Sequence, residues 1–93
     1  MPQGSLFEAA GPSLILNVDG ASRGNPGPAA AGWIVRDARD GEIIIEEGLY
    51  LSEETNNRAE YFALLFALED ALVLRAQKVL VRADSELMVK QMQ

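Results

Sequence analysis

The stretch that decides the fold is Thr55-Asn-Asn-Arg-Ala-Glu-Tyr-Phe-Ala-Leu-Leu-Phe-Ala-Leu-Glu-Asp-Ala-Leu72. Thr55 is a suitable N-cap, because its hydroxyl can accept a hydrogen bond from a free amide of the first helical turn. Large apolar residues then recur at helical spacing. They predict a long helix after Thr55 whose buried stripe consists of Tyr61, Leu64, Leu65, Leu68 and Leu72.

An alternating segment lies on each side of this helix. Residues 14–19 alternate apolar and mixed positions, which predicts a strand, and residues 78–84 predict a second strand in the same way. A strand, a helix and a strand in succession form a right-handed crossover, so the last strand should lie parallel to the first. This placement brings Asp19 and Asp84 onto neighbouring strands.

Two more strands complete the expected sheet. Residues 31–36 and 42–51 are joined by a turn-like segment, which predicts an antiparallel meander with the first strand. Residues 20–28 contain three glycines and two prolines, so we expect a loop there. The predicted fold class is α/β, with a mixed sheet made of a three-strand antiparallel meander, a crossover helix and a parallel fourth strand.

The two ends of the chain differ in character. Residues 1–13 predict a flexible leader, and residues 14–93 predict one domain. Ser85 is placed to cap a second helix that runs to residue 93. Its apolar positions are Leu87, Met88 and Met92.

Composition narrows the chemistry. The chain has 93 residues, no cysteine and no histidine, which excludes thiolate metal sites, imidazole ligands and a histidine base. No apolar run approaches the roughly 20 residues that span a bilayer, and the start of the chain lacks the pattern of a signal peptide. We therefore expect a cytoplasmic protein that does not enter a membrane.

Three acidic residues stand in polar settings where predicted elements begin or end. Asp19 and Asp84 end predicted strands, and Glu60 lies in the first turns of the predicted helix. Each has a structural alternative: an Asp before Gly forms turns, a Glu near a helix start meets the dipole, and an Asp before a helix can cap it. Converging carboxylates without histidine or cysteine favour a hard cation such as Mg²⁺.

Three segments resemble, in order, the first three catalytic blocks of the type 1 ribonuclease H family. They are Asp-Gly-Ala-Ser-Arg-Gly-Asn-Pro-Gly from Asp19, Thr-Asn-Asn-Arg-Ala-Glu-Tyr from Thr55, and Asp-Ser-Glu-Leu from Asp84. Three ordered blocks are more specific than one short motif. The resemblance runs from about residue 14 to the end. It implies that the family's last strand, its later helices and a fourth acidic residue lie beyond Gln93.

The resemblance implies a metal-dependent endonuclease that hydrolyses the RNA strand of RNA/DNA hybrids. Asp19, Glu60 and Asp84 would be the catalytic and metal-binding residues for two Mg²⁺ ions, with Mn²⁺ as a substitute. Two such ions can activate water and stabilise both the attacking and leaving oxygens. The fourth carboxylate of the family helps to hold the second ion, so we expect this short chain to be inactive or slow by itself.

The same resemblance implies a set of substrate-binding residues. Asn56 and Asn57 would lie along the minor groove, Thr55 would bind a DNA-strand phosphate, and the RNA backbone would contact Ser22, Asn25 and Ser85. Their structural alternative is helix and turn capping. The net charge of −6 excludes a broadly basic surface, so binding of a hybrid must be local.

Two other functional classes stay open from the sequence. One is an inactive or partner-dependent ribonuclease H-like binding module, and the other is a different nuclease or integrase of the same broad fold. An unpaired sheet edge and an uncovered apolar face favour association. We therefore expect the chain alone to be poorly folded or to form a homodimer through the incomplete sheet and the terminal helix.

Overall fold

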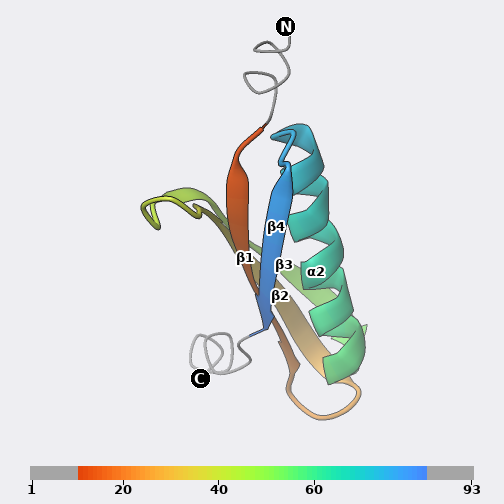
Figure 1. Ribbon diagram of the computed structural model, residues 1–93. Coiled ribbons are helices and arrows are strands. Elements are labelled where there is room, and N and C mark those ends of the chain that lie inside the picture. Colours follow the sequence, from red (N-terminus) through yellow and green to blue (C-terminus); the bar gives the residue numbers. More distant parts are fainter. Residues whose placement is uncertain (1–10, 84–93) are drawn as a thin grey trace, which may run out of the picture.

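The computed structural model describes residues 11–83, which form one mixed sheet with a helix against one face (Figure 1). The strands β1 (Ser13–Ser22), β2 (Gly27–Asp37) and β3 (Ile43–Glu54) form an antiparallel meander. Helix α2 (Asn56–Val73) then leads to β4 (Lys78–Ala83). Within this part of the chain the strand order is β3-β2-β1-β4, and β4 runs parallel to β1. The predicted fold class is therefore confirmed.

The ends of the prediction fall partly outside this region. Residues 1–10 of the expected leader, the last residue of the expected fourth strand and the whole expected second helix lie outside the described residues. Ser13, expected as the last residue of the leader, instead opens β1. Pro12 is attached to the segment before β4, because its carbonyl accepts a hydrogen bond from the Gln77 amide at 3.0 Å.

The loop is shorter than the predicted range of residues 20–28. Residues 20–22 belong to β1 and pair with β2 through Gly20↔Ala31, Ala21↔Ala30 and Ser22↔Ala29. Gly27 and Pro28 already belong to β2. Small residues on both strands let the antiparallel ladder continue past the glycine, so only residues 23–26 connect the two strands. The hairpin therefore extends well beyond Asp19.

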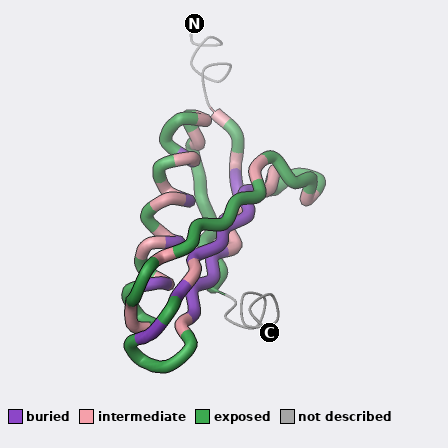
Figure 2. The backbone as a smooth tube through the Cα atoms, turned by 180° about the vertical axis from the view of Figure 1, so that it is seen from behind, coloured by how far each residue is buried: buried purple, intermediate pink, exposed green. Residues whose placement is uncertain are grey.

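The core lies between the sheet and α2. Alternate residues of the two central strands, Leu14, Leu16 and Val18 on β1 and Ala31, Trp33 and Val35 on β2, pack against the helix. Figure 2 shows the buried positions concentrated along these strands and one side of the helix. Trp33 belongs to this core: its ring stacks on Phe66 with centroids 5.1 Å apart, and its Nε1 donates to Asp70 Oδ2 at 2.7 Å.

The buried stripe predicted for the helix is wrong. The buried residues of α2 are Ala59, Ala63, Ala67 and Ala71. Of the predicted stripe, Tyr61, Leu65 and Leu72 are exposed at 59%, 40% and 77%, whereas Leu64 and Leu68 are half-buried. The alanine row lies at four-residue spacing and lets the helix backbone approach the sheet closely, which larger side chains at the same positions would prevent.

Within residues 11–83, no helix combines the length and the apolar character needed to span a membrane.

The closest approach of helix and sheet is at Gly20. A Cβ atom built on Gly20 would lie 2.2 Å from the Ala59 carbonyl carbon and 2.3 Å from the Glu60 nitrogen. Both of these are backbone atoms, so a side chain at Gly20 would force β1 and α2 apart. Glycine is required at this position for close packing rather than for an unusual backbone angle.

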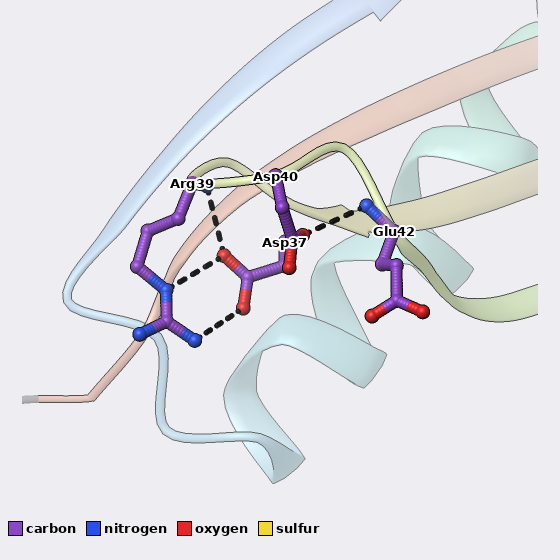
Figure 3. A network of polar contacts seen from close by, with 4 residues as sticks. All are labelled: Asp37, Arg39, Asp40 and Glu42. Atoms are coloured by element: carbon purple, nitrogen blue, oxygen red, sulfur yellow. Dashed lines mark hydrogen bonds and ion pairs between the residues drawn. The ribbon is translucent and has the colours of Figure 1, made fainter.

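The turn between β2 and β3 is held by polar contacts (Figure 3). The Asp37 carboxylate accepts from the Arg39 amide at 2.9 Å and from the Arg39 guanidinium at 3.2 and 3.0 Å. Asp40 accepts from the Glu42 amide at 2.9 Å. The hydrogen bonds from the Arg39 side chain, followed by the one from its amide, hold the pKa of Asp37 below its ordinary value.

We expect Gly20→Ala to destabilise the protein by about 1–3 kcal/mol, the usual cost of overpacking a tight interface. Gly48→Ala is the matched control, because its added Cβ meets nothing nearer than the Ala31 carbonyl oxygen at 3.8 Å. That control should be neutral or slightly stabilising, since alanine suits a strand better than glycine. Urea unfolding of both variants measures the difference. Equal stabilities would contradict the close approach at Gly20.

Leu72→Ala should change the free energy of unfolding by less than about 0.5 kcal/mol, as expected for an exposed position. Ala67→Leu places a large side chain on the fully buried helix face and should cost about 1–3 kcal/mol. If the alanine face is the buried one, Ala67→Leu therefore lowers the free energy of unfolding more than Leu72→Ala does. Thermal unfolding followed by circular dichroism checks this order. A larger loss of stability in Leu72→Ala would instead support the buried leucine stripe predicted from the sequence.

An NMR titration should place the pKa of Asp37 below its ordinary value of 3.8, and Arg39→Ala should bring it back up. Because the folded-state pKa is lowered, the contact stabilises the fold above the unfolded-state pKa. That contribution is lost as the pH falls through the folded-state pKa. The stability difference between wild type and Arg39→Ala should thus be present at neutral pH and vanish in strong acid. An unchanged Asp37 titration in Arg39→Ala would disprove the assignment.

Candidate active site

Asp19 lies on β1 and is almost fully buried, with 1% of its surface exposed. It pairs across the sheet with Gly32 of β2, which offers no side chain beside it. Side chains alternate along a strand, and Val18 faces α2. Asp19 therefore lies on the face of the sheet away from the helix.

Glu60 lies on the second turn of α2 and is half-buried. Its backbone nitrogen packs directly against Gly20, the residue that follows Asp19. The parallel pairing of β1 with β4 reaches Val18↔Ala83, at the last described residue of β4. The contact at Gly20 therefore brings the segment that carries Glu60 next to the segment that carries Asp19.

The third predicted carboxylate cannot be placed. Asp84, the residue directly after β4, lies outside the described residues, and so does Ser85. Between residues 11 and 83 no group of three or more acidic side chains is arranged to hold a metal ion. The structure brings the backbone of β1 next to Asp19 into contact with the backbone of α2 at Glu60. Both offer hard oxygen donors, which fit a divalent cation such as Mg²⁺.

The N-terminus of α2 is capped as predicted. The Thr55 hydroxyl accepts a hydrogen bond from the Arg58 amide at 3.2 Å. Arg58 also forms a 2.6 Å ion pair with Glu54, on the other side of the cap, and its guanidinium lies 5.5 Å from the centre of the Phe62 ring. Arg58 is therefore a brace of the first helical turn. Its four-residue spacing from Glu54 was a sequence signal for this pair.

The hairpin turn is joined to the helix by hydrogen bonds that the sequence did not reveal. The Asn56 side-chain oxygen accepts from the Ser22 amide at 2.7 Å and lies 3.0 Å from the Ser22 hydroxyl. The Asn25 side-chain oxygen accepts from the Asn56 amide at 3.0 Å. Three predicted substrate-binding residues, Ser22, Asn25 and Asn56, thus form one network. No local pattern predicts it, because its partners lie more than 30 positions apart in the sequence.

The remaining predicted contact residue is Asn57, in the first turn of α2. It is exposed, next to Asn56, and the structure shows no hydrogen bond of its side chain with any residue of the described part of the chain. The predicted residues therefore lie at the start of α2, with Thr55 as the N-cap and Asn56 and Asn57 exposed in the first turn, three to five positions before Glu60.

Comparison with known proteins identifies relatives of this chain. Residues 17–93 match the family model described as reverse transcriptase-like. The chain is 50% identical over 74 residues to ribonuclease HI of Halobacterium salinarum, covering 80% of this chain and 37% of that protein. It is 45% identical over 78 residues to ribonuclease HI of Streptomyces coelicolor, covering 82% of this chain and 32% of that protein.

Solved structures agree with the sequence relatives. The crystal structure of RNase H1 from Halobacterium salinarum matches with a TM-score of 0.72 and 46% identity, over 86% of this chain and 60% of that one. LC11-RNase H1 in complex with an RNA/DNA hybrid matches with a TM-score of 0.70 and 46% identity, over the same shares. The chain spans about a third of the length of these curated relatives and 60% of these solved chains. It belongs to the ribonuclease H family and corresponds to the N-terminal part of the domain.

Proposed function

We propose that this protein is a metal-dependent endonuclease that hydrolyses the RNA strand of RNA/DNA hybrids. The observation that carries the proposal is the contact of Gly20 with the backbone of Ala59 and Glu60. This contact brings the segments that carry Asp19 and Glu60 side by side, which supports a shared site for their carboxylates. A relative with 46% identity was solved in complex with an RNA/DNA hybrid, which supports the same substrate here.

Asp19, Glu60 and Asp84 would hold the metal in this proposal. Mg²⁺ or Mn²⁺, when bound, would supply Lewis-acid stabilisation of charge on the phosphodiester oxygens. The chain contains no histidine, so no imidazole is present to act as a general base. Burial of Asp19 keeps its carboxylate in a fixed position, and β1 and α2 are rigid elements on which to mount the two groups.

Substrate would be bound at the start of α2. Thr55, Asn56 and Asn57 on the helix side, with Ser22 and Asn25 on the hairpin side, form a polar surface next to the proposed catalytic edge. Ser85 would add to the same surface. Uncharged donors of this kind let a chain with a net charge of −6 bind a polyanion locally, without a basic patch.

A second candidate function is a hybrid-binding module that does not cleave. The hydrogen-bonded surface at the start of α2 is formed without Asp84, so binding would not require the complete site. The two functions differ in one measurement, cleavage of a hybrid that the protein binds.

Cleavage of a hybrid labelled on its RNA strand, in Mg²⁺, tests the proposal. We expect slow cleavage of the hybrid by this chain and no cleavage of double-stranded DNA or RNA. Asp19→Asn and Glu60→Gln should each lower the rate by about 100-fold or more, the effect of losing roughly 3 kcal/mol of transition-state stabilisation. Glu69→Gln, on an exposed position of the same helix, should retain the wild-type rate.

Metal binding is measured on the same variants by thermal unfolding. Mg²⁺ should raise the Tm of wild type and of Glu69→Gln but leave Asp19→Asn unchanged, because only a bound ion stabilises the folded state. Equal rates and equal metal responses in Glu60→Gln and Glu69→Gln would reject the proposed site. Hybrid binding without cleavage by wild type would support the binding module instead.

A further inference from the structure

The outer face of the sheet, which is the face away from α2, has no helix packed against it among the described residues (Figure 1). Parallel strands are normally covered on both faces. Leu16 of β1 packs against α2, so its neighbours Ile15 and Asn17 point to the outer face. Residues that pair with them in register on the next strands share that face. The outer face is therefore a candidate contact surface.

One row across this face carries opposite charges at its two ends. Asn17 pairs with Arg82 of β4 on one side and with Ile34 of β2 on the other. Ile34 in turn pairs with Glu46 of β3. Glu46 and Arg82 are exposed, and neither takes part in an ion pair within residues 11–83. Because β3 and β4 lie three strand spacings apart, roughly 14 Å, these two charges cannot meet within one copy.

The next row toward the start of β1 is apolar at both ends. Ile15 pairs with Leu80 of β4, which is 51% exposed. At the β3 end lies Ile44, which is 44% exposed and precedes a residue that packs against the core, so it points to the outer face. Between them, Arg36 is held along the sheet by its hydrogen bond to the Asn17 side-chain oxygen at 3.2 Å. Apolar and charged ends therefore lie side by side on β3 and on β4.

We infer that the outer face binds a second copy of this chain, sheet against sheet, about a two-fold axis parallel to the strands. Stacked sheets lie about 10 Å apart with their strands nearly aligned. Such an axis exchanges the two sides of the sheet and keeps each row at its own level, so β4 of one copy lies over β3 of the other. Arg82 then faces the partner's Glu46, and Leu80 faces the partner's Ile44. Two-fold symmetry forms each contact twice.

Charge complementarity favours a second copy over another kind of partner. A uniformly acidic partner would be repelled by Glu46, and a uniformly basic one by Arg82. A surface that matches both needs a base and an acid three strand spacings apart, and the outer face is itself such a surface. Although the chain has a net charge of −6, the charges of Glu46 and Arg82 cancel within the row. The dimer uses the face of the sheet rather than the edge expected from the sequence.

The row on the other side of Asn17 contains Asp19, which pairs with Gly32, and Gly32 pairs with Gly48. A second copy stacked on the outer face would cover this row as well. Association would therefore oppose the access of a hybrid to the proposed site. The association itself does not depend on the proposed function.

Sedimentation velocity of the full chain over a range of concentrations tests the inference. Wild type should show a reversible equilibrium between monomer and dimer. Glu46→Arg and Arg82→Glu should each weaken the dimer by about ten-fold or more, because two surface ion pairs become two like-charge pairs. An equimolar mixture of these two variants should form dimers again, since every contact between the two chains then joins a glutamate to an arginine.

Glu47→Arg is the matched control for Glu46→Arg. It makes the same change of charge one position further along β3, at another exposed residue. Glu47 pairs with Trp33, which packs against α2, so it lies on the helix side of the sheet and not on the outer face. This variant should keep the wild-type dimerisation constant. Thermal unfolding of all three variants checks that each is folded.

Weaker dimers in the two outer-face variants, with a restored dimer in their mixture and an unchanged Glu47→Arg, support the inference. Wild type that stays monomeric at every concentration overturns it. A dimer that Glu46→Arg and Glu47→Arg weaken equally shows that another surface is used, and a mixture no more dimeric than either variant alone refutes the pairing of Arg82 with Glu46. Because these measurements involve neither hybrid nor metal, a negative result leaves the proposed function intact.

Discussion

The close packing of α2 on β1 is the constraint on which the rest of the structure depends. Gly20 allows the helix backbone to reach the strand at Ala59 and Glu60, and the alanine row continues this contact along the helix. Short side chains at an interface bring backbones together, so the position of the helix is set by backbone contact rather than by flexible side chains. Side chains on β1 and α2 near this contact are therefore held in well-defined positions relative to one another.

Much of the fold was predictable because its signals are local. Alternation predicted the strands, Thr55 predicted the helix start, and the strand–helix–strand order predicted the parallel pairing of β4 with β1. The buried face of the helix was not predictable in the same way, because apolar periodicity gives more weight to leucine than to alanine. The closest contact with the sheet has room only for the smallest side chains, so the alanines face the sheet and Leu72 is exposed.

The same distinction between local signals and long-range contacts applies to the candidate site. Glu60 could be placed near the start of the helix from the sequence, but the role of Gly20 depends on a contact between residues 40 positions apart, which no local pattern contains. The amide network of Asn25 and Asn56 is of the same kind, since each hydrogen bond crosses more than 30 positions. Sequence motifs identify such residues, whereas the folded chain decides which atoms they present.

Two contacts determine how α2 sits on β1. Gly20 meets Ala59 and Glu60, while Ser22 meets Asn56, so moving forward along the strand corresponds to moving backward along the helix. The two strand residues lie roughly 6–7 Å apart along the strand, and four helical residues rise about 6 Å. The two spacings agree, so both contacts form without strain. A single contact would let the helix rotate about it, whereas two fix the direction in which Glu60 projects. The residues proposed to bind substrate therefore also orient the carboxylate proposed to hold the metal.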